Sequence, residues 1–130
     1  MFRKPLGPRW EATLLDQLIT GPDGTILVAG ADKEPLQPLL GLAVLVINTV
    51  PVSVVCDARR FVYLESLIVR SDARRVGIGQ SLVAASKAWA QAQNISSLEV
   101  AAWSFNIEAI TFYRKVGFSS TIERWAMPLE

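Results

Sequence analysis

Residues 61–80 read FVYLESLIVRSDARRVGIGQ, and this stretch decides the fold. Apolar and β-branched side chains dominate its first part, Phe61–Val69, which predicts a strand. Two closely spaced glycines, Gly77 and Gly79, follow a polar turn, and helical periodicity begins at Ile78. The sequence therefore predicts a strand, a tight turn and a helix in direct succession.

The helix that follows the glycines is expected to span residues 78–93. Its apolar face holds Ile78, Leu82, Ala85, Trp89 and Ala92. Asn94 suits the end of this helix, and residues 97–103 have the composition of another strand. Because strand–helix–strand connections within one sheet are right-handed, residues 61–103 predict a βαβ unit with parallel strands.

Further strands and helices are expected on either side of this unit. The periodicity predicts a helix over residues 9–19, strands over 25–31 and 39–55, a helix over 106–116 and a final strand over 125–129. A short polar connection at residues 57–60 predicts antiparallel pairing of the strands that flank it. Strict alternation along the second of these strands would put Tyr63, Glu65, Leu67 and Val69 on one face.

The predicted fold is a single domain over residues 1–130, of mixed α/β class. A mainly antiparallel sheet would contain a central parallel βαβ unit and be flanked by helices. The mostly apolar stretch at residues 39–56 contains Asn48 and Pro51, so a strand broken near the proline explains it better than a membrane helix. Residues 1–8 lack the apolar run of a signal peptide.

Composition excludes several kinds of chemistry. The 130 residues include no histidine, which removes Ser-His, Cys-His and His-metal sites, and we expect no metal. A single cysteine, Cys56, permits no internal disulfide and fits a reducing compartment, so the cytoplasm is expected. A net charge of +1 argues against a nucleic-acid partner.

The turn before the helix has the features of an anion site. Free amides and the helix dipole meet at a helix N-terminus, glycines let the backbone approach a ligand closely, and Arg74 and Arg75 add charge. Purely structural glycines and solvated arginines would look the same. The P-loop pattern is absent, and the dinucleotide pattern fails because Leu82 stands where its third glycine would be. Glu99 imitates the ribose-binding acid of that pattern but lies inside a strand.

Two blocks of sequence together resemble the GNAT superfamily of acyl-CoA-dependent N-acetyltransferases. The first is Arg-x-x-Gly-x-Gly at Arg74–Gly79, opening a helix. The second is Asn106-Ile-Glu-Ala109 followed by Phe112-Tyr-Arg-Lys-Val-Gly-Phe118. The blocks occur in the family's order, with room for the expected helix and strand between them, and the resemblance covers residues 24–130.

The resemblance implies acetyl-CoA as cosubstrate and assigns residues to its binding. The loop that would hold the pyrophosphate comprises Arg74, Arg75, Val76, Gly77, Ile78, Gly79 and Gln80, and is called the glycine loop below. Leu67, Ile68 and Val69 would pair through their backbone with the pantetheine arm, in a gap between two splayed strands, or serve as core residues. Asn106 would contact the same arm, or act as a plain helix N-cap.

The resemblance also implies the chemistry, in which acetyl-CoA is attacked directly by a primary amine through one tetrahedral intermediate. Tyr113 would protonate the departing CoA thiolate, unless it is a core aromatic residue with a wet hydroxyl. Glu65, an acid within an apolar strand, would accept the proton of the amine, directly or through water; partial burial would make it a stronger base. The alternative for Glu65 is an ion pair with Arg59, Arg60 or Arg124. Gly117 and Phe118 are expected to be structural.

The acceptor would be an amine-bearing small molecule, protein or peptide. Trp103 and Trp125 could line a pocket, but we expect them in the core. Family members usually carry one strand and two helices before the strand expected at residues 25–31, so the N-terminal part is expected to be missing or abbreviated, as in a short member, a misassigned start codon or a fragment. A missing strand would leave an open sheet edge that a homodimer could cover.

Two other classes of function stay open on the sequence. A non-catalytic acyl-CoA-binding or regulatory domain of the same fold would keep the glycine loop but lack an acceptor pocket. A nucleotide-binding fragment of another α/β fold is the more distant alternative. Calorimetry with CoA, NAD and ATP separates these classes of ligand, and thioester turnover separates an enzyme from a binding domain.

Overall fold

The structure, a computed structural model, describes residues 2–4, 10–14, 23–30, 39–50 and 59–129. Its strands form one sheet in the order β1-β2-β3-β4-β5-β6. Their bounds are β1 Phe2–Lys4, β2 Trp10–Leu14, β3 Gly24–Gly30, β4 Leu39–Val50, β5 Arg59–Val69 and β6 Leu98–Glu99. Neighbours pair antiparallel from β1 to β5, and β5 pairs parallel with β6. The mixed, mainly antiparallel sheet is therefore confirmed, with its parallel pair at one edge.

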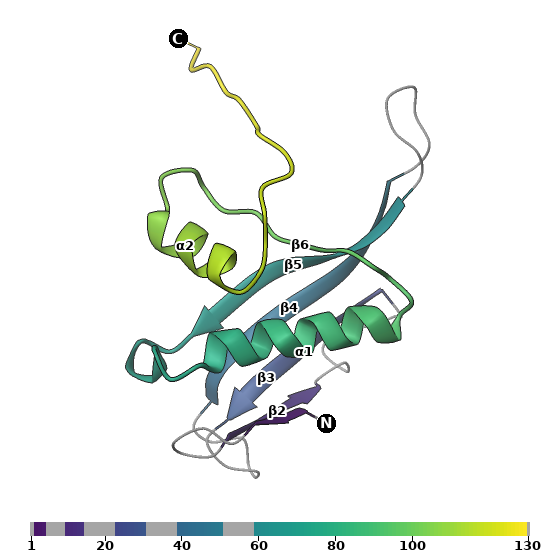
Figure 1. The fold of residues 1–130 in the computed structure, drawn as a ribbon, viewed down its shortest axis with the longest axis vertical. Helices are drawn as coiled ribbons and strands as arrows, with labels where there is room; N and C mark the ends of the chain where they lie inside the picture. Colours follow the sequence, from purple (N-terminus) through teal and green to yellow (C-terminus); the bar gives the residue numbers. More distant parts are fainter. Residues whose placement is uncertain (1, 5–9, 15–22, 31–38, 51–58, 130) are drawn as a thin grey trace.

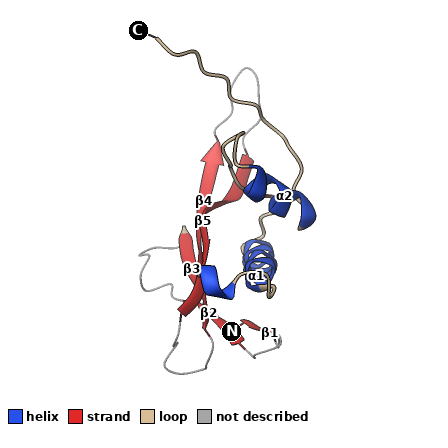
Figure 2. Ribbon diagram, turned by 90° about the vertical axis from the view of Figure 1, so that its left-hand side faces the viewer, coloured by secondary structure: helices blue, strands red, loops and turns tan. Residues whose placement is uncertain are grey.

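In the described residues, two α-helices lie on one face of this sheet (Figure 2). The chain leaves β5 through a 3₁₀ turn, Ser71–Ala73, forms α1 over Ile78–Ala92 and returns to β6. A second helix, α2, spans Ile107–Lys115 and lies beside β5 and β6 in Figure 1. The predicted βαβ unit is thus present, and both helices belong to the same layer.

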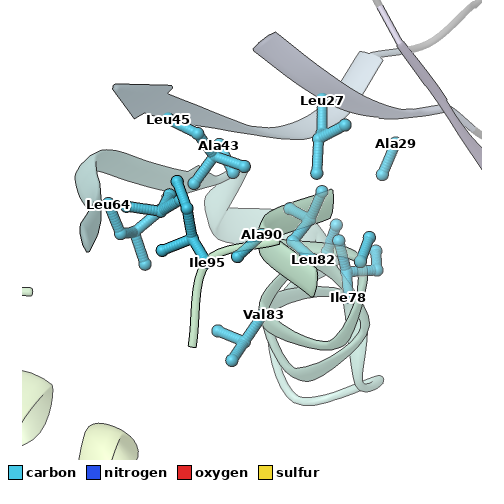
Figure 3. Packing of buried hydrophobic residues seen from close by; sticks show 13 residues of the cluster. Leu27, Ala29, Ala43, Leu45, Leu64, Ile78, Leu82, Val83, Ala90 and Ile95 are labelled. Atoms are coloured by element: carbon cyan, nitrogen blue, oxygen red, sulfur yellow. The ribbon is translucent and has the colours of Figure 1, made fainter. Parts of the chain in front are cut away.

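The core lies between α1 and the strands β3 to β5 (Figure 3). Leu27, Leu45 and Leu64 point from the sheet toward Ile78 and Leu82 on the helix. The predicted apolar face of α1 holds at Ile78, Leu82 and Ala85, which are buried, and Trp89 is half-buried. Ala92, at the last turn, is exposed because the helix ends there.

Gly41 on β4 lets α1 and β5 approach closely. A Cβ atom at this position would lie 2.8 Å from the carbonyl oxygen of Ile68 and 3.2 Å from Cδ1 of Leu82. Any larger residue would push the backbone of β5 or the helix outward. The sequence signal for this role is a lone glycine inside an apolar strand.

The N-terminal prediction is wrong where the structure describes it. Residues 10–14 form β2, paired antiparallel with β3, instead of the first turn of a helix, and β1 pairs with β2. The stretch Trp10-Glu-Ala-Thr-Leu14 also alternates with period two, so its spacing fits a strand as well as a helix. Residues 15–19 lie outside the described residues. With β1 and β2 beside β3, the reason for expecting a dimer at this edge disappears.

A β-bulge interrupts β5 at Glu65. On β4, Val44 pairs with Ser66 and Leu45 pairs with Leu64, so Glu65 is the extra residue. Single strict alternation along β5, as predicted from the sequence, is therefore wrong.

Because of the bulge, the side chains of β5 that face the core have even residue numbers before Glu65 and odd residue numbers after it. Val62 and Leu64 belong to the core before it, and Leu67 and Val69 pack against the same core after it. Tyr63 thus does not share the face of Leu67 and Val69. One inserted residue lets β5 bury both of its halves while leaving Glu65 exposed.

The C-terminal part carries fewer paired residues than expected. β6 covers residues 98–99 instead of 97–103, and residues 125–129 form no strand. Trp103 and Trp125 are 74% and 85% exposed, so their assignment to the core is wrong. Both lie in segments without a paired strand to carry them into the core.

Some predictions fall outside the described residues. Cys56, the break near Pro51 and the connection up to residue 58 belong to this group. Among the described helices, none is long and apolar enough to cross a membrane.

Candidate functional site

The glycine loop has an unusual backbone that exposes amide groups. Arg75 has φ +68° and Gly77 has φ +88°, so left-handed residues stand on both sides of Val76. The hydrogen bond from the Ser81 amide to the Gly77 carbonyl oxygen, at 3.0 Å, is the first of the helix. The amides just before Ser81, which begin α1, therefore have no acceptor one turn earlier. Such a cluster of amides is a concave anion site.

Charge and capping at the start of α1 agree with this backbone. No side chain of the described residues caps the helix, and its first turn contains no acid. Arg74 and Arg75 are exposed beside it. The positive end of the helix dipole and the two guanidinium groups favour a ligand with several negative charges. The residues present fit a pyrophosphate, as the sequence predicts.

Contacts to β5 hold the glycine loop in place. Nε of Arg74 donates a long hydrogen bond, 3.4 Å, to the carbonyl oxygen of Val69. Arg70 donates to Asp72 across the 3₁₀ turn, with 3.0 Å between Nε and Oδ1. This hydrogen bond holds the pKa of the Asp72 carboxyl below its usual range. Both contacts are exposed, so they restrain the turn before the loop only weakly.

The start of α1 also touches α2. A Cβ atom at Gly79 would lie 3.3 Å from Cζ of Phe112 and 3.7 Å from Cγ2 of Val69. Gly79 thus serves close packing of the two helices as well as access to the backbone. Phe112 in turn contacts the ring of Tyr113 edge to face, with 5.6 Å between centroids.

β5 and β6 separate soon after they meet. In the described residues they pair at two positions, Val62 with Leu98 and Tyr63 with Glu99. Figure 1 shows β6 running on from there without following the end of β5. The outer backbone edge of Leu67–Val69 therefore lies beyond the paired part of β6. This is the splayed arrangement that the resemblance implies for a pantetheine arm.

The three residues of this edge differ in burial. Leu67 and Val69 pack against the core, as the structural reading predicts, while the side chain of Ile68 is 57% exposed. Their inner edge pairs with Gly41–Ala43 of β4. Core packing of the side chains is thus compatible with an outer backbone edge that has no paired strand in the described residues, where Arg74 donates to the Val69 carbonyl oxygen.

Tyr113 is half-buried on α2 and held by aromatic neighbours. Its ring meets that of Phe118 edge to face, with 5.5 Å between centroids. Burial raises the pKa of the Tyr113 phenol, and the nearby Tyr63 raises it further. The phenol therefore stays protonated at neutral pH and can donate a proton or a hydrogen bond.

Glu65 is exposed, not partly buried. In the described part of the chain it makes no ion pair, and Arg59 is instead paired with Glu99. Arg59 also lies over the ring of Phe61, 4.4 Å from its centroid. This pairing explains Glu99 as a structural acid. Glu65 stands two residues after Tyr63, whose phenol is the neighbour of Tyr113.

Asn106 is the N-cap of α2. Its Oδ1 accepts a hydrogen bond from the Ala109 amide at 3.1 Å, which confirms the capping interpretation without testing a ligand contact. At the other end, the Gly117 amide donates to the Arg114 carbonyl oxygen at 3.1 Å, and the Phe118 amide to the Tyr113 carbonyl oxygen at 2.9 Å. With φ +115° at Gly117, this is a Schellman motif. The structural interpretation of Gly117 and Phe118 is confirmed.

A cavity of about 470 Å³ lies elsewhere, near the C-terminal end of α1. Its lining includes Lys87, Asn94 and Phe118, and none of the residues of the glycine loop. The residues that the resemblance assigns to CoA, at the start of α1 and the adjoining edge of β5, therefore lie outside this cavity.

Comparison with known proteins agrees with this geometry. A model of the acetyltransferase (GNAT) family matches residues 1–118. No curated protein matches the sequence. Among solved structures, a mutant of the BH1408 protein from Bacillus halodurans is 24% identical, with a TM-score of 0.76 over 86% of this chain and 69% of that chain.

Aminoglycoside acetyltransferases are also among the similar structures. Aminoglycoside N-acetyltransferase AAC(6')-Iy, solved in complex with CoA, is 22% identical, with a TM-score of 0.71 over 88% of this chain and 72% of that chain. An aminoglycoside acetyltransferase from an uncultured soil metagenomic sample is 18% identical, with a TM-score of 0.65 over 89% of this chain and 72% of that chain. At these identities the likeness concerns the fold.

Proposed function

The chain belongs to the acetyltransferase (GNAT) family, and we propose that it transfers the acetyl group of acetyl-CoA to a primary amine. The observation that carries the proposal is the start of α1, where uncapped amides, two left-handed residues and two exposed arginines occur together within residues 74–80. A CoA pyrophosphate fits this charge and backbone. CoA in the similar aminoglycoside acetyltransferase supports the choice of ligand.

The pantetheine arm is proposed to lie along the outer edge of Leu67–Val69. An extended amide-bearing chain can pair with an open strand edge as another strand does. This placement would bring the thioester toward the bulge at Glu65 and toward Tyr113. Asn106 is proposed to contact the same arm while it caps α2.

The proposed reaction is direct acyl transfer. The neutral amine attacks the thioester carbonyl carbon, a C–N bond forms, and the C–S bond breaks from one tetrahedral intermediate. Glu65 accepts the proton that the amine loses, directly or through water, and Tyr113 gives its proton to the CoA thiolate. The raised pKa keeps the Tyr113 phenol protonated at neutral pH, which its proposed role as the proton donor requires.

Ligand binding and turnover test the class of function. Calorimetry should show binding of acetyl-CoA and no binding of NAD or ATP at the same concentrations. A panel of small amines, aminoglycosides and lysine peptides should then reveal release of free CoA thiol with at least one acceptor. Binding of NAD or ATP in place of acetyl-CoA would contradict the proposal. Acetyl-CoA binding without turnover of any amine would favour a non-catalytic acyl-CoA-binding domain.

Substitution of the two residues proposed as acid and base tests the chemistry. General acid or base catalysis contributes typically about 10²–10⁴-fold, so Tyr113→Phe and Glu65→Gln should lower kcat by this order, with little change in the Kd of acetyl-CoA. Tyr63→Phe is the matched control, because it removes the neighbouring phenol from β5. A kcat for Tyr113→Phe equal to that of wild type at every pH would remove the acid assignment.

A further inference from the structure

The cavity near the C-terminal end of α1 is separate from the site proposed for acetyl-CoA. Its volume is about 470 Å³, and its lining includes no residue of the glycine loop and neither Glu65, Asn106 nor Tyr113. Pockets that bind small molecules usually measure about 300–1,000 Å³. The cavity is therefore large enough to hold a small ligand of its own.

The buried part of the cavity lining is apolar. The lining comes from the second half of α1, from residues 94–98 and from residues 116–118, which follow α2. Val83, Ala90 and Ile95 are buried, and Val116 and Phe118 are half-buried. A hydrocarbon group placed against these side chains would be removed from water, which favours its binding.

The exposed part of the lining is polar and carries one positive charge. It comprises Lys87, Gln91, Asn94 and Ser96, and these four residues are called the rim below. Lys87 is the one charged side chain among the described lining residues, and in the described part of the chain it makes no ion pair or hydrogen bond. An unpaired ammonium beside amide and hydroxyl groups favours an anionic group of a ligand.

The ends of the two helices do not reverse this charge. A helix C-terminus carries a partial negative charge, which by itself would favour a cation. At the end of α1, however, the amides of Asn94 and Ile95 donate to the carbonyl oxygens one turn earlier, at 3.0 and 3.1 Å. Arg114 and Lys115 oppose the dipole in the last turn of α2. Lys87 therefore determines the sign of the charge at the rim.

We propose that this cavity binds a small carboxylate that has an apolar body, such as a short straight-chain carboxylic acid. The carboxylate would accept hydrogen bonds from the Lys87 ammonium at the rim, and the hydrocarbon part would pack against Val83, Ala90 and Ile95. A neutral molecule would leave the ammonium without an ionic partner, and an amine would meet a like charge. The combination of one cation and an apolar interior thus selects the class of ligand.

Phe118 connects the cavity with the residue proposed as the catalytic acid. It lines the cavity, its ring meets that of Tyr113 edge to face at 5.5 Å, and its amide donates to the Tyr113 carbonyl oxygen at 2.9 Å. A ligand that packs against Phe118 should therefore change the surroundings of the Tyr113 ring. This link to catalysis rests on the proposed function, whereas the binding of a carboxylate does not.

Calorimetry with two matched probes tests the class of ligand. Hexanoate should bind to the wild-type chain, and the neutral hexanamide should bind at least about tenfold more weakly, because it forms no charge-assisted pair with Lys87. Lys87→Met keeps an unbranched apolar stem and should raise the Kd of hexanoate about tenfold, whereas Lys87→Arg should keep most of the affinity. Arg60→Met removes an exposed cation outside the lining and should leave the Kd unchanged.

Three results of these titrations would overturn the proposal. They are no binding of hexanoate to wild type, equal Kd values for hexanoate and hexanamide, and an unchanged Kd in Lys87→Met. Acetyl-CoA binding is measured on the same samples. Its absence beside normal hexanoate binding would contradict the proposed function and not the carboxylate site.

Filling the cavity tests where the ligand lies. Ala90→Leu puts a larger side chain into the buried part of the lining and should abolish hexanoate binding, whereas Ala84→Leu, on the exposed side of α1, should not. Hexanoate should shift the ring NMR signals of Phe118 and Tyr113 in wild type and leave those of Phe105, which is not a lining residue, in place. Shifts at Phe105 alone would refute this location, and the Lys87→Met titration keeps the test valid if Ala90→Leu does not fold.

The chain's own C-terminal segment is the competing occupant. Residues 119–129 follow Phe118 directly, and their side chains are exposed in this structure. A chain with both Trp125→Ser and Met127→Ser should therefore bind hexanoate with the wild-type Kd. Binding that appears only in this double variant would mean that the segment fills the cavity, and the proposal would fail.

Discussion

The two helices on the covered face of the sheet begin in opposite ways. α2 begins with Asn106, whose side chain accepts a hydrogen bond from the Ala109 amide, and with an acid, Glu108, in its first turn. α1 begins after Gly77 with no side-chain cap from any described residue and with no acid in its first turn. The helices share a layer and the same core, so the difference lies in their first turns.

This difference leaves the first backbone amides of α1 without a side-chain acceptor among the described residues, as the proposed ligand site requires. A side-chain cap contributes about 1 kcal/mol to a helix, and a non-glycine residue such as Arg75 in the left-handed region costs about 1–2 kcal/mol. The start of α1 is thus less stable than an ordinary helix start. Strained backbone conformations of this kind are common at functional sites, because the strained conformation can also direct backbone groups toward a ligand.

The largest effect on stability and on acetyl-CoA binding is expected at Gly77. Its replacement should disturb the start of α1 and leave α2 unchanged. With φ +88°, Gly77→Ala should cost about 1–2 kcal/mol of unfolding free energy. It should also raise the Kd of acetyl-CoA about tenfold, equivalent to about 1.4 kcal/mol, because the amides turn away from the ligand position. Urea unfolding and calorimetry measure the two effects.

Gly117→Ala is the matched control for this prediction. Gly117 also has positive φ, at +115°, and a Cβ atom there would meet nothing within 4 Å. Its replacement should therefore cost a similar unfolding free energy through the backbone alone, while the Kd of acetyl-CoA stays at the wild-type value. Equal rises in Kd for both variants would mean that stability, not a ligand site at the start of α1, explains the loss of binding.

Asn106 allows a complementary test at α2, the helix that has a side-chain cap. Asn106→Ala removes the acceptor of the Ala109 amide and should cost about 1 kcal/mol of unfolding free energy. Asn106→Asp keeps a capping oxygen and should recover most of this stability. If Asn106 also contacts the pantetheine arm, both variants should raise the Kd of acetyl-CoA. A Kd that follows stability in both variants would leave Asn106 as a cap and nothing more.

The sequence predicted best those elements whose signals are local. The glycines, the helical period from Ile78 and the Asn94 end of α1 lie close together in the chain, and the structure confirms all three. The same holds for the caps of α2, because Asn106 and Gly117 act on amides within a few residues. Capping and turn chemistry depend on adjacent residues, so one sequence suffices to read them.

Long-range features were harder to predict. The bulge at Glu65 depends on the pairing of β5 with β4, and without it the alternation puts Tyr63 and Leu67 on the same face. The close approach at Gly41 likewise depends on Ile68 and Leu82, which are distant in sequence. The stretch 10–14 fits both periods, and pairing with β3 made it a strand. Strand register and burial depend on residues that are distant in the sequence. A local sequence pattern does not identify those residues.

The smallest expected effect concerns the turn that leads into the start of α1. Hydrogen bonds from Arg70 hold the pKa of Asp72 below its usual range, so the folded state binds a proton there less readily than the unfolded state. The stabilisation by this pair is therefore fully present above about pH 4, the ordinary carboxyl pKa, and is lost as the pH falls through the lower pKa of the folded state.

The unfolding free energies of wild type and Asp72→Asn should differ slightly at pH 7 and converge in acid. Because both groups are exposed, salt should reduce the difference as well. A gap that stays constant with pH would assign the effect to the shape of the turn and not to its charge, and the start of α1 would then depend on Gly77 and Arg75 without help from this ion pair.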